Sequence, residues 1–212
     1  MSGVSSVPLN RRRMPRQGRS LVTVAAIFEA TIQVLLTEGP IRLNTTRVAE
    51  RAGVSVGTLY QYFPNKQSLL LALLERHLTS LTSIVEEACH ENLNIRSDKI
   101  ASVVVDAYLE AIMAHAEVSP ALYYIAVDLD AGRLLDKAVQ KSVQAIETLL
   151  ASASDGHFSE SYVIAQTMAA VLFGAVPAFC IRVMPPGAGV EAKRQLELMF
   201  SAYLSAHKAM IP

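Results

Sequence analysis

Residues 48–63 read Val48-Ala49-Glu50-Arg51-Ala52-Gly53-Val54-Ser55-Val56-Gly57-Thr58-Leu59-Tyr60-Gln61-Tyr62-Phe63, and this segment decides the fold. Two short helical patterns flank a break at Gly53-Val54-Ser55. Gly53 accepts the positive φ of a sharp turn, and Ser55 can cap the second pattern. The apolar residues are spaced to form a small shared core. This arrangement predicts a helix-turn-helix, in which one helix braces a second that can enter the DNA major groove.

The chain on both sides of this segment extends the helical pattern. Aliphatic residues and alanine dominate, glycine and proline are sparse, and no run alternates β-branched with polar residues. Capping residues, glycines and prolines delimit the expected helices, which run over about residues 20–37, 45–52, 56–63, 65–92, 97–117, 119–129, 132–152, 161–184 and 190–208. The sequence therefore predicts an all-α fold of about nine helices.

The formal net charge is zero, but the two parts of the chain differ in sign. Residues 1–80 hold ten Lys and Arg against four Asp and Glu, a balance of +6; residues 81–212 hold nine against fifteen, a balance of −6. Basic residues attract phosphates and acidic residues repel them. The split predicts an N-terminal unit that faces nucleic acid and a C-terminal unit with another role.

Cys89 and Cys180 are isolated, and no cysteine and histidine residues have the spacing of a metal site. Isolated cysteines are typical of reduced thiols in the cytoplasm. The N-terminus has arginines but no apolar segment of the signal-peptide type behind them. We therefore expect a cytoplasmic protein with no metal and no cofactor.

The segment from Ser161 to Ile181 contains no charged residue and allows two interpretations. About 20 apolar residues can span a bilayer. A helix buried on all sides, as at a subunit interface, has the same composition. Because Gln166, Thr167, Gly174 and Pro177 interrupt the segment and no second span accompanies it, we favour the buried helix and expect no contact with a membrane.

The second helix of the helix-turn-helix has one face suited to DNA. Gly57 lacks a side chain, so the backbone there can lie close to a duplex. Thr58 can donate to a phosphate, and Gln61 can read a base edge through two hydrogen bonds. Leu59 and Phe63, four residues apart, point back into the unit.

Three further features favour phosphate contact. The hydroxyls of Tyr60 and Tyr62 can donate to phosphates, and Lys66 adds a charge at the start of the next helix. Residues 1–18 form a basic arm, expected to be disordered, that can reach the duplex. In the alternative interpretation, the tyrosines are packing aromatics and the arm is a solvated tail.

Residues 45–66, Thr45-Thr46-Arg47-Val48-Ala49-Glu50-Arg51-Ala52-Gly53-Val54-Ser55-Val56-Gly57-Thr58-Leu59-Tyr60-Gln61-Tyr62-Phe63-Pro64-Asn65-Lys66, resemble the signature of the TetR (tetracycline-repressor-like) family of bacterial regulators. The resemblance runs from about Ser20 to Leu74, without departure in the core motif. It implies a helix-turn-helix DNA-binding domain over residues 19–66 and a helical regulatory and dimerisation domain over residues 67–212.

The resemblance also assigns roles to individual residues. Thr46 and Arg47 would meet the backbone beside the recognition helix, bases would face Val56, Gly57, Thr58 and Gln61, and phosphates would face Tyr60, Tyr62 and Lys66. The complete expected DNA-binding set is Thr46, Arg47, Ser55, Val56, Gly57, Thr58, Tyr60, Gln61, Tyr62 and Lys66. The last two long helices would form a homodimer, whose two recognition helices bind the half-sites of a palindromic operator in double-stranded DNA.

The regulatory site would lie among the fifth to eighth helices. Its candidate lining residues combine apolar faces with a few polar tips. They are Tyr108, His115, Tyr123, Tyr124, Gln166 and Phe173. Each has an alternative interpretation as a core residue, His115 included. Their chemistry favours a small hydrophobic or aromatic effector.

Three classes of function compete. The leading hypothesis is a ligand-responsive transcriptional regulator, usually a repressor, released from its operator by a small molecule. We do not expect an enzyme, since the sequence has no Ser/His/Asp arrangement, no metal-ligand spacing and no phosphate loop. A non-specific architectural DNA-binding protein is disfavoured by the long acidic part after residue 81.

Overall fold

The computed structural model describes residues 18–114, 117–181 and 188–209. Within these residues the regular elements are nine helices: α1 (Gly18–Arg42), α2 (Thr45–Arg51), α3 (Val56–Tyr62), α4 (Lys66–Glu91), α5 (Ser97–Met113), α6 (Ser119–Asp128), α7 (Gly132–Ala151), α8 (Ser161–Ile181) and α9 (Ala188–His207). The predicted all-α fold is confirmed. The predicted basic arm lies almost wholly outside the described residues, so its disorder stays a prediction.

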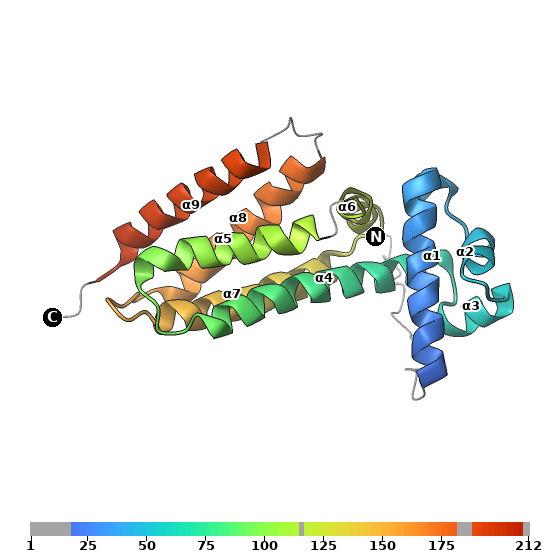
Figure 1. The fold of residues 1–212 in the computed structure, drawn as a ribbon, viewed down its shortest axis with the longest axis horizontal. Coiled ribbons are helices and arrows are strands. Elements are labelled where there is room, and N and C mark those ends of the chain that lie inside the picture. The colour runs from blue at the N-terminus through green and yellow to red at the C-terminus, as the bar shows by residue number, and fades with distance from the viewer. Residues whose placement is uncertain (1–17, 115–116, 182–187, 210–212) are drawn as a thin grey trace, which may run out of the picture.

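The first three helices form a unit at one end of the molecule (Figure 1). Ile27 and Val34 on α1, Val48 on α2 and Leu59 on α3 are all at most 1% exposed and share one core. The α2–α3 turn is made by Gly53, whose φ of 67° belongs to the left-handed region that glycine tolerates. These positions correspond to the apolar spacing of the helix-turn-helix.

α1 continues further than the sequence predicts. Glycine and proline were expected to end this helix near Thr37, yet helical structure runs to Arg42. The chain does break at Gly39, with φ 79° and ψ 168°, so Pro40 begins a short final turn in a new direction. The final turn of α1 thereby reaches over the start of α2.

α4 connects the two ends of the molecule (Figure 1). Its N-terminus is closed by a capping box, in which Asn65 accepts from the Ser68 amide at 2.7 Å and the Asn65 amide donates to the Ser68 hydroxyl. The first half of α4 belongs to the same core as α1–α3, and the second half to the core of the C-terminal bundle. The predicted domain boundary after residue 66 therefore falls at the start of a helix that both cores share.

α6 also belongs to the N-terminal core. Val118, Leu122 and Ile125 are buried there together with residues of α1 and α4, and α6 contacts α1, α4 and α8. Because α6 and the first half of α4 complete this core, the helix-turn-helix does not fold around its own residues alone.

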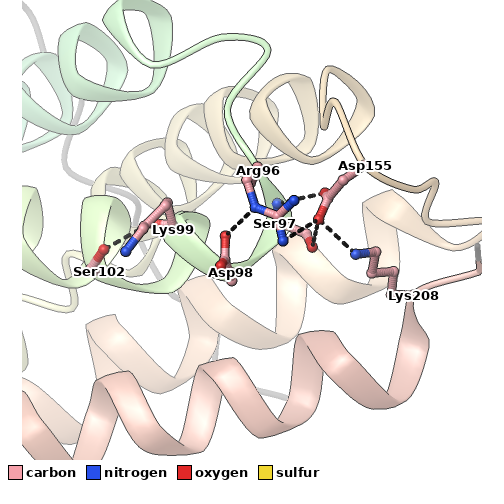
Figure 2. A network of polar contacts seen from close by, with 7 residues as sticks. All are labelled: Arg96, Ser97, Asp98, Lys99, Ser102, Asp155 and Lys208. Atoms are coloured by element: carbon pink, nitrogen blue, oxygen red, sulfur yellow. Dashed lines mark hydrogen bonds and ion pairs between the residues drawn. The ribbon is translucent and has the colours of Figure 1, made fainter.

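A polar cluster joins three segments at the far end of the bundle (Figure 2). Asp155, in the α7–α8 loop, accepts hydrogen bonds from the Ser97 amide at 2.8 Å and from the Lys208 ammonium at 2.8 Å. Arg96 lies 3.6 Å from the same carboxylate. Beside it, His157 and Ala209 exchange two backbone hydrogen bonds of 3.0 Å. We call Arg96, Ser97, Asp155 and Lys208 the C-terminal clasp.

Two helices, α1 from Ser20 and α4, are long and apolar enough to cross a membrane by length and composition. The α4 window is 56% buried, mainly in the two cores just described, whereas the α1 window is 33% buried. Core helices of soluble proteins pass the same test. The uncharged α8 (Ser161–Ile181) has an apolar segment over its described side chains, Ser161–Gly174.

Candidate nucleic-acid interface

The local sequence presents α3 in one orientation. Ser55 caps the helix by accepting from the Thr58 amide at 3.0 Å, and the two hydroxyls lie 2.8 Å apart. Leu59 and Phe63 are 0% and 5% exposed and anchor the inner face. The outer face, which includes Gln61, is therefore left in solvent. A short capped helix with a polar outer face is suited to lie in a groove.

Gly57 is the residue of α3 whose identity the chain itself does not explain. It is exposed and lies within α3, and it is not one of the described residues that have a positive φ. A Cβ built there would meet the Ser55 Oγ at 3.7 Å, an ordinary contact. Alanine would be more stable in a helix than glycine by roughly 0.5–1 kcal/mol. The absence of a side chain is therefore favoured by something outside the described chain, such as a close partner.

The two tyrosines that follow are held by hydrogen bonds rather than buried. The Tyr60 hydroxyl lies 3.0 Å from the Thr45 Oγ1 on α2, and the Tyr62 hydroxyl lies 3.0 Å from the Ser20 Oγ on α1. The Tyr60 side chain remains 44% exposed. A phenolic oxygen both donates and accepts, so each hydroxyl keeps capacity for a further partner such as a phosphate.

Three cations beside α3 have partners on the second half of α1. The Lys66 ammonium donates to the Pro40 carbonyl at 3.0 Å. The Arg51 Nε donates to the Gln33 Oε1 at 2.8 Å. The third cation, Arg47, makes an ion pair with Glu38, and its side chain is 50% exposed.

The ten residues expected to contact DNA all keep some exposure. They lie on α2, on α3 with its cap, or at the start of α4, and none is buried. α2 and α3 sit at the end of the molecule away from the bundle, where a duplex can approach them (Figure 1). The DNA contacts themselves stay a prediction.

Three residues that hold this surface together, Glu38, Gln33 and Pro40, were not predicted from the sequence to do so. Their partners Arg47, Arg51 and Lys66 are separated from them by 9, 18 and 26 residues. The positive net charge of residues 1–80 indicated unpaired cations, but not which acceptors would hold them.

The candidate effector residues are only partly brought together. Tyr108 on α5 is 1% exposed, and its ring lies edge-on to Phe173 on α8, with the centroids 5.2 Å apart. Tyr124 on α6 is 53% exposed, and Gln166 lies on the exposed side of α8. His115 lies outside the described residues, as does the Tyr123 side chain. The structure thus brings two of the six candidate residues, Tyr108 and Phe173, into contact and leaves two others, Tyr124 and Gln166, exposed to solvent.

Two hollows lie along the seam between α4 and α7. One, of about 250 Å³, is lined by Glu86, Cys89, His90, Leu93, Lys141, Gln144, Ala145 and Thr148. The other, of about 140 Å³, also borders Lys141. Burial raises the pKa of the Cys89 thiol to about 12, so the thiol stays protonated at neutral pH and is a poor nucleophile. Neither hollow is lined by the candidate effector residues.

Residues 27–73 match the model of the bacterial regulatory proteins of the tetR family. The match covers α1 from Ile27 onward, α2, α3 and the capped start of α4, which carry most of the surface described above. This part of the chain is a tetR-family DNA-binding domain. Members of this family are DNA-binding regulators rather than enzymes, which agrees with the function class expected from the sequence.

Two curated relatives each resemble less than half of the chain. The nucleoid occlusion factor SlmA of Haemophilus ducreyi is 35% identical over 95 residues, 44% of each chain. The transcriptional activator FasR of Mycolicibacterium smegmatis is 35% identical over 96 residues, 44% of this chain and 42% of FasR. The chain thus matches less than half the length of these relatives.

The fold resembles that of solved TetR-family structures over a longer span. The fatty acid degradation regulator FadR of Bacillus halodurans superposes with a TM-score of 0.65 over 88% of this chain and 97% of FadR, at 15% sequence identity. At this identity the likeness concerns the fold alone. It extends the agreement from the helix-turn-helix to the C-terminal bundle.

Proposed function

We propose that this regulator is a homodimeric repressor, which binds a palindromic operator through α3 and leaves it when a small hydrophobic or aromatic molecule binds among α5–α8. The observation that carries the DNA-binding part is Gly57. The chain has room for a side chain there and would gain helix stability from one. A groove floor or a phosphate close to the backbone is the physical reason for leaving it out.

The charges around α3 support the same proposal. Arg47 and Arg51 lie on α2, and Lys66 is the first residue of the long helix α4, whose N-terminus favours negative charge. Binding through such contacts weakens steeply as salt concentration rises, because each neutralised phosphate releases counterions.

Dimer formation is supported by the outer faces of α8 and α9. Tyr162 and Val163 on α8 are 45% and 50% exposed, and Gln166, Thr167 and Ala170 continue the same uncharged stripe. On α9, Leu198 is 59% exposed. The exposed uncharged stripe on α8 favours a protein partner, and the TetR-family resemblance favours a second copy of this chain.

A dimer also meets the requirements of binding. α3 has seven residues and can read few base pairs. Two copies related by a two-fold axis would read two half-sites about one helical turn apart, which raises both affinity and specificity. The palindromic operator follows from that symmetry.

The effector part of the proposal rests on the Tyr108–Phe173 contact. Phe173 packs against both hydrophobic cores, so a molecule that displaced its ring would disturb α6 and the first half of α4 as well as the bundle. Release of DNA would then follow from a shift between two conformations. Because the FadR relative is a fatty acid degradation regulator, fatty acids and their derivatives are the first compounds to test.

The experiment that tests the proposal is selection of binding sites from randomised duplexes by the full-length protein. The expected result is an inverted repeat, bound with an affinity that falls steeply with salt. Tyr62→Phe combined with Lys66→Ala should lower affinity for the selected duplex roughly tenfold, since it removes phosphate contacts from each half-site. Unchanged affinity would show that these residues are not in the interface.

The same preparation tests the dimer through a matched pair of substitutions. Val163→Asp places a charge on the exposed face of α8, and Val127→Asp places the same charge on α6, where valine is 80% exposed. Sedimentation analysis should show a dimer for the wild type and for Val127→Asp and a monomer for Val163→Asp. Thermal-shift measurements with fatty acids then test the effector, because a ligand that binds the folded state raises the melting temperature.

A further inference from the structure

The end of α1 supplies acceptors to the cations beside the recognition helix. Glu38 pairs with Arg47, and the Pro40 carbonyl accepts from Lys66 at 3.0 Å. Both acceptors flank Gly39, where the backbone of α1 breaks with φ 79°. The break turns the last residues of α1 toward α2 and the start of α4. Glu38 is the charged member of this group and therefore the one that can compete with a phosphate.

The Glu38 carboxylate is well placed to hold its partner. Its side chain is 25% exposed, and the Oε2 atom that faces Arg47 is shielded from solvent. A partly buried carboxylate without a counter-charge is costly, so separating the pair is unfavourable. The Arg47 side chain, by contrast, is half exposed.

A guanidinium can keep one partner and take another. It carries five N–H donors in a planar fork, and carboxylates and phosphates each engage one edge of that fork. Glu38 occupies one edge of Arg47 and thereby fixes the direction of the other. A phosphate at one position can then bind the free edge without separating Arg47 from Glu38.

We propose that Glu38 is a specificity-determining residue that positions Arg47 for the phosphate geometry of the operator. On DNA of another sequence the protein would sit at a different position relative to the phosphates. Arg47 could then reach a phosphate only by separating from Glu38, whose unpaired carboxylate would lie close to the negatively charged DNA. Glu38 would therefore weaken binding to random DNA more than binding to the operator. This inference rests on the proposed DNA-binding function.

The pair is not required to hold α2 in place. Val48 and Ala49 on α2 are completely buried in the N-terminal core, and the helix is capped by Asn44, which accepts from the Arg47 amide at 2.9 Å. Glu38→Gln keeps the size of the side chain. The variant should therefore fold, which thermal denaturation checks.

The test compares two duplexes of equal length, one selected by the wild-type protein and one of random sequence, over a range of salt concentrations. Glu38→Gln should raise affinity for the random duplex about three- to fivefold and should raise affinity for the selected duplex less. Discrimination, the ratio of the affinity for the selected duplex to that for the random duplex, should therefore fall. On the random duplex the salt dependence should steepen by about one released counterion, because Arg47 gains a phosphate.

A matched control separates positioning from loss of charge. Glu50→Gln removes one carboxylate from the exposed face of α2. It should raise affinity for both duplexes by the same factor. In an Arg47→Ala background, Glu38→Gln should also act equally on both duplexes, because the residue through which Glu38 acts is absent.

Each result has a distinct meaning. If Glu38→Gln changes discrimination no more than Glu50→Gln does, or if its effect persists without Arg47, the inference about Glu38 is wrong while DNA binding stands. If the wild-type protein binds neither duplex, the proposed function itself fails.

Discussion

The two ends of the molecule use polar contacts in opposite ways. In the C-terminal clasp, Ser97, Lys208 and Arg96 converge on one carboxylate, that of Asp155, whose side chain is 16% exposed. At the end that carries α3, Arg47 makes an ion pair with one carboxylate and remains half exposed. The clasp joins three segments of chain, whereas the pairs near α3 leave donors free.

The difference separates contacts that hold segments of the chain together from contacts that leave donors available to a further partner. A group held by several convergent hydrogen bonds gains little from a new partner and loses much if one is removed. A half-exposed cation with a single partner can accept a phosphate at modest cost. Substitutions at the clasp should therefore change stability, and substitutions around α3 should change DNA binding.

The largest effect is expected from Gly57→Ala. The added methyl group fits the free protein but would enter the space proposed for the duplex, once in each half-site. Affinity for a selected duplex should fall at least about tenfold, while the melting temperature stays equal or rises, because alanine favours a helix. Electrophoretic mobility shift and calorimetry measure the two quantities. A variant that bound DNA normally would remove the main observation behind the proposal.

A smaller effect, on thermal stability rather than on DNA affinity, is expected from Asp155→Asn. The amide keeps the shape of the side chain but loses the charge that Lys208 and Arg96 share. The melting temperature should fall by roughly 2–6 °C, with DNA affinity of the folded protein unchanged. Asp98→Asn is the matched control, since Asp98 is 56% exposed and contacts the clasp through Arg96 alone at 3.4 Å. Equal shifts for the two variants would argue against a structural role of the clasp.

The smallest expected effect concerns the dependence of thermal stability on pH in the acid range. Hydrogen bonds from Lys208 and Ser97 hold the pKa of the Asp155 carboxyl well below its ordinary value of 3.8. Its contribution to stability is therefore complete above about pH 4–5 and is lost as the pH falls further, when the carboxyl becomes protonated. The difference in melting temperature between wild type and Asp155→Asn should shrink between pH 5 and pH 3. A constant difference over this range would show that the charge of Asp155 does not contribute.

Local patterns determined most of what the sequence could predict. The caps at Ser55 and Asn65, the turn at Gly53 and the inward positions of Leu59 and Phe63 all follow from interactions within a few residues, and the structure has them as expected. The end of α1 was less predictable. Gly39 marks a break, but the continued turn depends on contacts with later parts of the chain.

Long-range polar partners could not be predicted. Lys208 meets Asp155 across 53 residues and Arg51 meets Gln33 across 18, and no periodic pattern connects such positions. The same limit applied to the effector residues. Tyr108 and Phe173 were placed on apolar faces, and they do meet, whereas Tyr124 and Gln166 were placed on similar faces but are exposed. Helical spacing indicates which side of a helix a residue occupies, but not what that side packs against.

The shared core of α1, α4 and α6 has a practical consequence for building chimeric regulators. A graft that transferred residues 19–66 to another protein would leave behind Leu69 and Leu73 on α4 and Leu122 and Ile125 on α6, all of which are buried against the transferred helices' core. The graft would expose an incomplete apolar surface. An exchange of operator specificity should instead keep the natural core and replace only the outward residues of α3 and its neighbours.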